Sequence, residues 1–192
     1  DQTALPLNVT TIDCRNLESV VHAIRVLQVR GAPAIGIAAA YGICVGLQTI
    51  DADQCTTQQF DERLQHCVKQ LADSRPTAVN LFWALQRMQS VTQTLRQAGQ
   101  LPSPIMKALL KEAIAIHDED REMCHAIGKH GATLLDHGQG VLTHCNAGGL
   151  ATSEYGTALS VLFSAQDQGK TLHVFVDETR PLLQGARLTA WE

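Results

Sequence analysis

Apolar residues recur at helical spacing through most of the first part of the chain. Asn16 is a residue type that caps helix N-termini, and the apolar positions after it fall three and four residues apart, so a helix is predicted to end near Val29. Further helices are predicted from the same spacing over residues 60–72, 76–89 and 104–135. This part of the chain is therefore predicted to be mainly helical.

Two arginines stand directly before predicted helix starts. Residues 30–42 are mostly small, which lets backbones approach closely, and Pro33 suits the first turn of a helix. Arg30 precedes this helix, so its guanidinium and the first amides would converge on one anion. Arg75 repeats the arrangement. Together they suggest a phosphate clamp; the alternative is a tight packing segment and two ordinary surface arginines.

From Gly138 the pattern changes to strands alternating with helices. A strand is predicted over 141–143, a helix over 151–165, a second strand over 172–176 and another helix over 182–189. This βαβ order predicts two parallel strands joined by a right-handed crossover. Two parallel strands do not make a self-sufficient sheet, so we expect more chain or a partner to complete it.

Cys145 follows the first predicted strand, where open α/β sheets place ligand chemistry. The helix expected after Gly148-Gly149 would offer amides that hold an anion and lower a thiol pKa. Because the second strand ends at the same edge, the segment from Asp177 to Gln184 should be its neighbour. The alternative for Cys145 is a buried structural thiol.

The composition of the chain indicates which classes of protein it can belong to. The chain has 192 residues, 45% hydrophobic and 18% charged, with a net charge of −4, which indicates a globular protein and argues against a nucleic-acid surface. Its longest apolar run is interrupted by proline and glycines and is too short to span a bilayer. The six cysteines form no CxxC pair and no leader precedes Asp1, so a cytoplasmic location with free thiols is expected. The acidic stretch 117–122 is interpreted as a solvated face with local ion pairs rather than a metal site.

Several motifs in this order resemble one family. They are Val29-Arg30-Gly31-Ala32-Pro33-Ala34-Ile35-Gly36, Ser74-Arg75-Pro76-Thr77-Ala78-Val79-Asn80-Leu81, Thr143-His144-Cys145-Asn146-Ala147-Gly148-Gly149-Leu150-Ala151-Thr152, Tyr155-Gly156-Thr157-Ala158-Leu159 and residues 178–189. Together they resemble the methylthioribose-1-phosphate isomerases of methionine salvage, relatives of the α, β and δ subunits of translation initiation factor 2B. One departure is Gly149, where the family usually has alanine.

The resemblance implies an α/β protein with a mostly helical N-terminal domain, residues 1–120, and the first half of a Rossmann-like parallel-sheet domain, residues 121–192. The implied reaction converts 5-methylthioribose 1-phosphate into 5-methylthioribulose 1-phosphate without metal or organic cofactor. Cys145 matches the active-site cysteine. The positions that match substrate contacts are Arg30, Gly31, Ala32, Arg75 and Gln184.

In the same family a catalytic aspartate and an asparagine–lysine pair lie beyond the segment that this sequence matches. We therefore expect the chain to be an inactive fragment of a larger, homodimeric isomerase, with a sugar phosphate as its small-molecule partner and no nucleic-acid or membrane partner. The alternatives are a non-catalytic regulatory subunit that senses a sugar phosphate or nucleotide, a ribose-1,5-bisphosphate isomerase, and a leftover product of a disrupted gene or of proteolysis.

Overall fold

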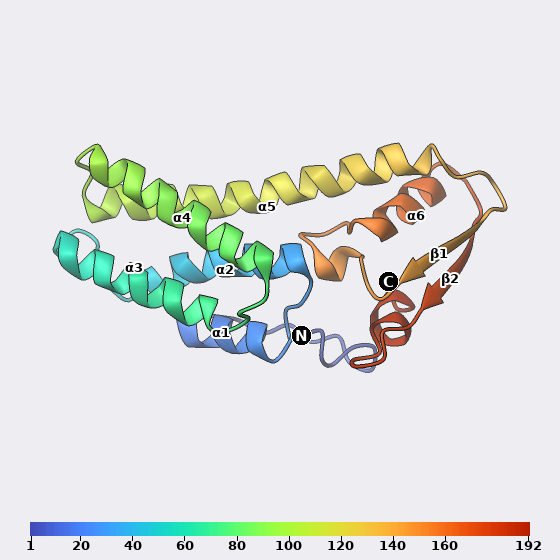
Figure 1. Ribbon diagram of the computed structural model, residues 1–192, viewed down its shortest axis with the longest axis horizontal. Helices are drawn as coiled ribbons and strands as arrows, with labels where there is room; N and C mark the ends of the chain where they lie inside the picture. Colours follow the sequence, from blue (N-terminus) through green and yellow to red (C-terminus); the bar gives the residue numbers. More distant parts are fainter. The chain divides into compact units, whose positions relative to one another are not determined.

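A computed structural model describes all residues, 1–192, and divides them into two compact units (Figure 1). The helical unit comprises Ile12–His117, and the sheet unit comprises Asp1–Thr11 together with Asp118–Glu192. The division falls inside the longest helix, α5 (Pro102–Ala132). The sequence did not predict that residues 1–11 join the sheet unit. The structure has no helix with the combined length and apolar character that crossing a membrane requires.

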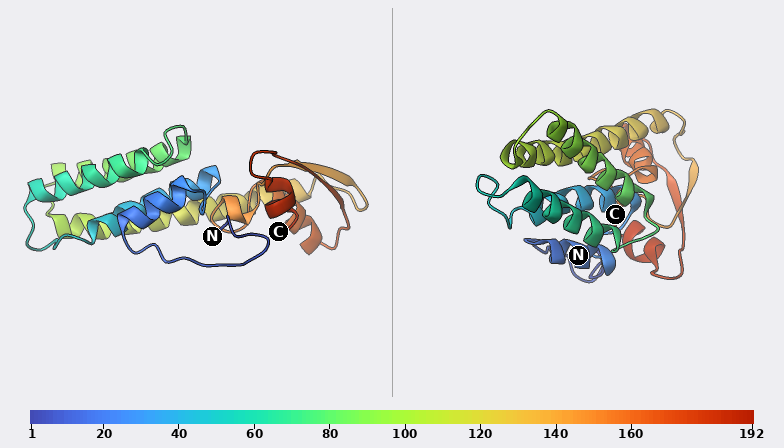
Figure 2. Two further views of the ribbon diagram at one scale, coloured as in Figure 1. Left: turned by 90° about the horizontal axis from the view of Figure 1, so that it is seen from below. Right: turned by 60° about the vertical axis from the view of Figure 1, so that its left-hand side comes forward.

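The helical unit is built around one apolar helix. α2 (Ala32–Leu47) contacts α1 (Leu17–Arg25), α3 (Thr57–Ala72) and α4 (Val79–Gln97), which surround it in Figure 2. Its sequence has apolar or small residues on every side, as a helix buried on all faces requires. The other helices are amphipathic and turn their apolar stripes toward it. Large side chains buried almost completely in this core include Phe60, Leu17, Ile24, Ile43, Leu47, Leu71, Leu81, Met88, Ile105 and Leu109.

Capping residues explain where the helices begin and end. The predicted N-cap Asn16 is confirmed, because its side chain accepts the Ser19 amide while Ser19 bonds back to the Asn16 backbone. α1 ends at Arg25 rather than near Val29, so the predicted end was wrong. Leu27 adopts a left-handed φ of 66°, which stops the helix and turns the chain toward the next motif.

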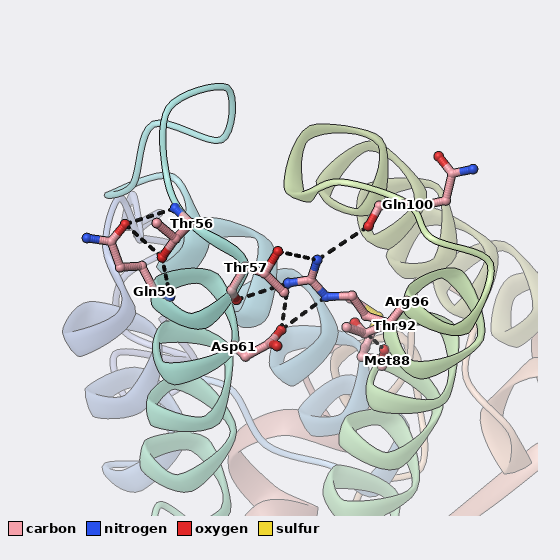
Figure 3. Close-up of polar contacts among 8 residues, drawn as sticks. All are labelled: Thr56, Thr57, Gln59, Asp61, Met88, Thr92, Arg96 and Gln100. Atoms are coloured by element: carbon pink, nitrogen blue, oxygen red, sulfur yellow. Dashed lines mark hydrogen bonds and ion pairs between the residues drawn. The ribbon is translucent and has the colours of Figure 1, made fainter.

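One arginine fastens the start of α3 to the end of α4 (Figure 3). Arg96 Nη2 donates to Asp61 Oδ1 at 2.9 Å and to the Thr57 carbonyl at 3.0 Å, and Nη1 donates to the Gln100 carbonyl at 3.3 Å. Its guanidinium also lies 5.2 Å from the centre of the Phe60 ring. Several donors on one planar group therefore hold two helices and the loop after α4 in a fixed arrangement.

The sheet unit contains the predicted βαβ motif. Strands β1 (Gly140–His144) and β2 (His173–Asp177) pair in parallel, with His144 opposite Asp177, and α6 (Ala158–Asp167) lies between them in the chain. The helix predicted from residue 151 begins only at Ala158. A short 3-10 turn, η1 (Gly149–Ala151), and an irregular segment come first.

One side chain from α5 and one from within the irregular segment keep that segment from forming a helix. The buried carboxylate of Asp120, on α5, accepts the Ser153 amide at 2.8 Å, and Thr152 Oγ1 accepts the Gly156 amide at 3.0 Å. Main-chain amides that donate to these side chains cannot also form the hydrogen bonds of a helix. The start of α6 is therefore set by contacts that local periodicity does not contain.

The C-terminal segment forms one π-helical turn, η2 (Gly185–Thr189), instead of the helix predicted over 182–189. Arg187 in this turn donates to the carbonyl oxygens of Gln2, Thr3 and Leu5, at distances of 2.8 to 3.2 Å. These bonds hold the N-terminal segment beside η2, as Figure 1 shows. Hydrogen bonds from a charged donor are strong, so the bonds from the Arg187 guanidinium to these carbonyl groups explain why residues 1–11 belong to the sheet unit.

Candidate active site

Cys145 occupies a strained turn at the carboxyl end of β1. Its φ is 61°, in the left-handed region, which costs a non-glycine residue about 1 to 3 kcal/mol. The Cys145 amide donates to the Asp177 carbonyl at 3.1 Å, and the Cys145 carbonyl accepts the Thr189 hydroxyl at 2.5 Å. The structure thus brings Cys145 and the end of β2 together, as the sequence predicted.

The anion at this turn belongs to the chain itself. Glu192 Oε1 accepts the Leu150 amide at 2.9 Å, and Glu192 Oε2 accepts from Asn146 Nδ2 at 2.5 Å. A Cβ on Gly148 would lie 2.2 Å from Glu192 Oε2, so only glycine leaves room for the carboxylate. The sequence predicted helix-start amides here that could bind an external anion. These amides instead belong to a 3-10 turn, and one of them, that of Leu150, donates to the Glu192 carboxylate.

Gln184 stands at the end of a loop organised by Glu178. The Glu178 carboxylate accepts amides from Thr179, Gly185 and Ala186, at 2.7, 2.8 and 3.0 Å. These amides, that of Ala186 foremost, hold the Glu178 pKa below its usual value. Leu183, just before Gln184, has a left-handed φ of 52°. Gln184 is half-buried, and its position is set by a loop whose anchoring carboxylate, Glu178, comes directly after the end of β2.

The two arginine motifs lie in the helical unit, at helix starts that no side chain caps. Gly31 is the N-cap of α2 with a φ of 94°, and Ala78 is the N-cap of α4. Arg30 is buried, at 8% exposure, and Arg75 is half-buried. Ser74 does not cap α4, because its hydroxyl donates to the Leu71 carbonyl.

These two helix starts lie against each other. A Cβ on Gly36 would lie 2.9 Å from the Asn80 carbonyl oxygen, so the start of the second turn of α2 lies against the first turn of α4. Uncapped helix N-termini carry partial positive charge, and each of these is preceded by an arginine. The helical unit therefore has two neighbouring helix starts of the kind that can bind phosphate, each with an arginine shortly before it in the chain.

The predicted site residues fall into two groups, one in each unit. Arg30, Gly31, Ala32 and Arg75 belong to the helical unit, whereas Cys145 and Gln184 belong to the sheet unit.

Backbone strain is concentrated near these motifs. The non-glycine residues with positive φ are Leu27, Cys145 and Leu183. Leu27 precedes Arg30 by three residues, Cys145 is itself a predicted site residue, and Leu183 precedes Gln184. Strained backbone persists only where surrounding contacts enforce it, and it often marks functional positions.

Sequence reasoning missed four polar residues that shape the site. Asp120, Glu178, Thr189 and Glu192 each bond to the backbone of the Cys145 turn, the segment after it or the Gln184 loop. Glu178 and Thr189 lie within the family motif over residues 178–189. The motif therefore indicated that this segment matters, but it did not indicate that these two side chains bond to the backbone. Asp120 was instead read as part of a solvated acidic face. The Asp118–Arg121 ion pair on that stretch, at 3.0 Å, does match the prediction.

The six cysteines are unpaired but differ in surroundings. Burial raises the pKa of Cys44 to about 11 and also raises the pKa values of Cys67 and Cys124. A raised pKa keeps a thiol protonated and poorly nucleophilic at neutral pH. Cys145, by contrast, is only half-buried.

Residues 28–192 match the family model described as the initiation factor 2 subunit family. The chain belongs to the initiation factor 2 subunit family. Over the whole chain it is 52% identical to a methylthioribose-1-phosphate isomerase of Geobacter sulfurreducens and 52% identical to a 5-deoxyribose 1-phosphate isomerase of Moorella thermoacetica. It spans about half, 54%, of each of these curated relatives.

Solved structures of this family share the fold. A 5-methylthioribose 1-phosphate isomerase from Pyrococcus horikoshii OT3 is 40% identical with a TM-score of 0.91, and the match covers 100% of this chain and 52% of that one. A protein described as the delta subunit of translation initiation factor eIF-2B from A. fulgidus is 43% identical with a TM-score of 0.87, covering 100% and 54%. The expected α/β fold of this family is confirmed.

Proposed function

We propose that the protein carrying this chain isomerises 5-methylthioribose 1-phosphate to 5-methylthioribulose 1-phosphate in methionine salvage. The observation that carries the proposal is the 52% identity, over the full chain, to a relative named for that isomerase. The residues that the resemblance assigns to substrate lie at structurally distinctive points, namely two uncapped helix starts and a strained turn.

The reaction is redox-neutral overall and needs a proton to enter and another to leave. The phosphate on the anomeric oxygen prevents spontaneous ring opening, so the ring oxygen must be protonated as its bond to C1 breaks. The hydrogen on C2 then moves to C1, and the C2 hydroxyl loses its proton to become the ketone. C1 is reduced and C2 is oxidised within one molecule, which requires stabilisation of charge at those carbons.

We assign the phosphate to the group in the helical unit. Arg30 and Arg75 supply planar, permanently charged donors, and Gly31 and Ala32 present the first amides of α2. The Cys145 turn is less suited to a phosphate, because the Leu150 amide there already binds the Glu192 carboxylate. In the sheet unit, Cys145 is proposed to assist proton transfer, and Gln184 is assigned to substrate binding by the resemblance.

A second candidate is isomerisation of 5-deoxyribose 1-phosphate, which the equally identical Moorella relative supports. The two substrates share the phosphate and the reacting carbons and differ only in the substituent on C5. A discrimination based on one apolar substituent is worth about 1 to 3 kcal/mol, or roughly 10- to 200-fold in kcat/KM. The same residues would therefore serve either reaction.

The experiment is a comparison of kcat/KM for the whole protein on 5-methylthioribose 1-phosphate, 5-deoxyribose 1-phosphate and ribose 1,5-bisphosphate. The highest value on the methylthio substrate supports the proposal. Turnover of none of them would overturn it and favour a regulatory subunit of the initiation-factor type.

The proposal extends to assembly and location. We propose a homodimer in the cytoplasm, and the six unpaired thiols support the location because reducing compartments keep cysteines free. Analytical ultracentrifugation of the whole protein tests the dimer, and a monomer at micromolar concentration would refute it.

A further inference from the structure

Both backbone polar groups of Cys145 are held by residues far along the chain. Its amide donates to the carbonyl of Asp177, at the end of β2, and its carbonyl accepts the hydroxyl of Thr189, at the end of η2. Thr189 is buried, with 8% of its surface exposed. The φ of Cys145 sets the direction of its Cα–Cβ bond. Groups that fix the Cys145 backbone therefore also fix the direction in which its side chain leaves the backbone.

The direction of the Thr189 hydroxyl follows from its neighbours. Asn146 Nδ2, which can only donate, lies 3.1 Å from Thr189 Oγ1. Thr189 must accept this bond, and its own hydrogen is therefore left to donate to the Cys145 carbonyl. The other hydrogen of Asn146 Nδ2 goes to Glu192 Oε2, and Glu192 Oε1 accepts the Leu150 amide.

These bonds form one ordered chain from Leu150 through Glu192, Asn146 and Thr189 to Cys145. Asn146 is buried at 7% exposure, so its amide hydrogens have little access to water as an alternative acceptor. A buried network in which every donor has an acceptor specifies one arrangement of its members. Here the arrangement includes the left-handed turn of Cys145.

We propose that Thr189 is a positioning residue for Cys145, with Asn146 and Glu192 orienting the Thr189 hydroxyl. Thr189 contacts the cysteine backbone, not its sulfur, so it acts by keeping Cys145 in a conformation that an unrestrained cysteine rarely adopts. The consequence for catalysis rests on the proposed function, in which the Cys145 thiol assists the reaction. The conformational claim does not depend on it.

The decisive variant is Thr189→Val, which keeps the branched shape and removes only the hydroxyl. Its matched control is Thr189→Ser, which keeps the hydroxyl and loses a methyl group. Two measurements are made on the whole protein: kcat and KM with 5-methylthioribose 1-phosphate, and amide hydrogen exchange of peptides covering residues 145–150.

Thr189→Val should lower kcat about tenfold or more and leave KM within about twofold, because small displacements of a reacting group cost rate rather than binding. Exchange over 145–150 should accelerate. Thr189→Ser should restore both measurements to near the wild-type values. A general loss of packing would instead affect both variants and would raise KM as well.

A second variant keeps the test decisive if Thr189→Val does not fold. Glu192→Gln preserves size and the acceptor for Leu150 but faces Asn146 with an amide, so it should lower kcat by a smaller factor with KM unchanged. Wild-type kcat and exchange in the valine and glutamine variants, or an equal loss of kcat in the serine control, would overturn the proposal. If the wild-type protein turns over no sugar phosphate, the proposed function fails, and the exchange rates alone decide whether Thr189 positions Cys145.

Discussion

At the scale of single residues, the proposed substrate-binding arginines differ from the carboxylates that hold the backbone in place. Arg30 and Arg75 precede uncapped helix starts, whereas Glu178 and Glu192 accept main-chain amides. Residue type and order were enough to place Arg30 and Arg75 before helix starts and Cys145 at the end of β1. The carboxylates were not predicted, because their acceptor roles depend on loops that meet only after folding.

Arg75→Ala should mainly weaken phosphate binding. Losing a charged hydrogen bond costs about 1.5 to 3 kcal/mol, so KM for the sugar phosphate should rise roughly 10- to 100-fold while kcat changes much less. Steady-state kinetics of the whole protein measure this. Arg15→Ala is the control, since Arg15 is exposed and bonds only to nearby Asp13. An unaltered KM in Arg75→Ala would argue against the clamp.

The Gln184 loop should depend on pH through Glu178. Because main-chain amides lower the pKa of this carboxyl in the folded protein, its contribution to stability is present above its ordinary value of 4.5 and is lost as pH falls through the lowered pKa. Protection factors of the Gly185 and Ala186 amides should therefore drop between neutral and strongly acidic pH. Glu178→Gln should show low, pH-independent protection at both amides. Equal protection in wild type and variant would contradict this role.

At the scale of elements, hydrophobic periodicity predicted the helices of the helical unit and both strands. Two of the errors lie where polar side chains accept main-chain amides. Asp120 holds Ser153 out of a helix before α6, and Glu178 binds the amides of Gly185 and Ala186 at the start of η2. Periodicity describes which face is buried and contains no information on such long-range acceptors. The left-handed turn of Leu27 similarly ended α1 earlier than its apolar pattern indicated.

The contact between α3 and α4 should depend on Arg96. Arg96→Ala removes bonds to Asp61, Thr57 and Gln100, but Asp61 is about half exposed, so the expected loss is only about 1 kcal/mol of unfolding free energy. Denaturant unfolding followed by circular dichroism measures it. Arg15→Ala, which breaks a fully surface ion pair, should change stability by less than about 0.5 kcal/mol. Equal effects of the two variants would show that Arg96 does not fasten these helices.

At the scale of the whole molecule, the chain spans about half of the curated relatives it matches. The resemblance places a catalytic aspartate and an asparagine–lysine pair outside the matched segment. The 192-residue chain alone is therefore predicted to show no isomerase turnover, although its Cys145 turn is fully built. A coupled assay of the purified chain tests this, and detectable turnover would refute it.

Cys145→Ser in the whole protein tests the central claim, which is that the strained turn after β1 carries the chemistry of a sugar-phosphate isomerase. If Cys145 assists proton transfer, kcat should fall about 100-fold or more, while KM stays near the wild-type value because the residues proposed to bind the phosphate, Arg30 and Arg75, are unchanged. Cys14→Ser, which alters another half-buried thiol, should retain wild-type kinetics. A Cys145→Ser protein with unchanged kcat would contradict the account.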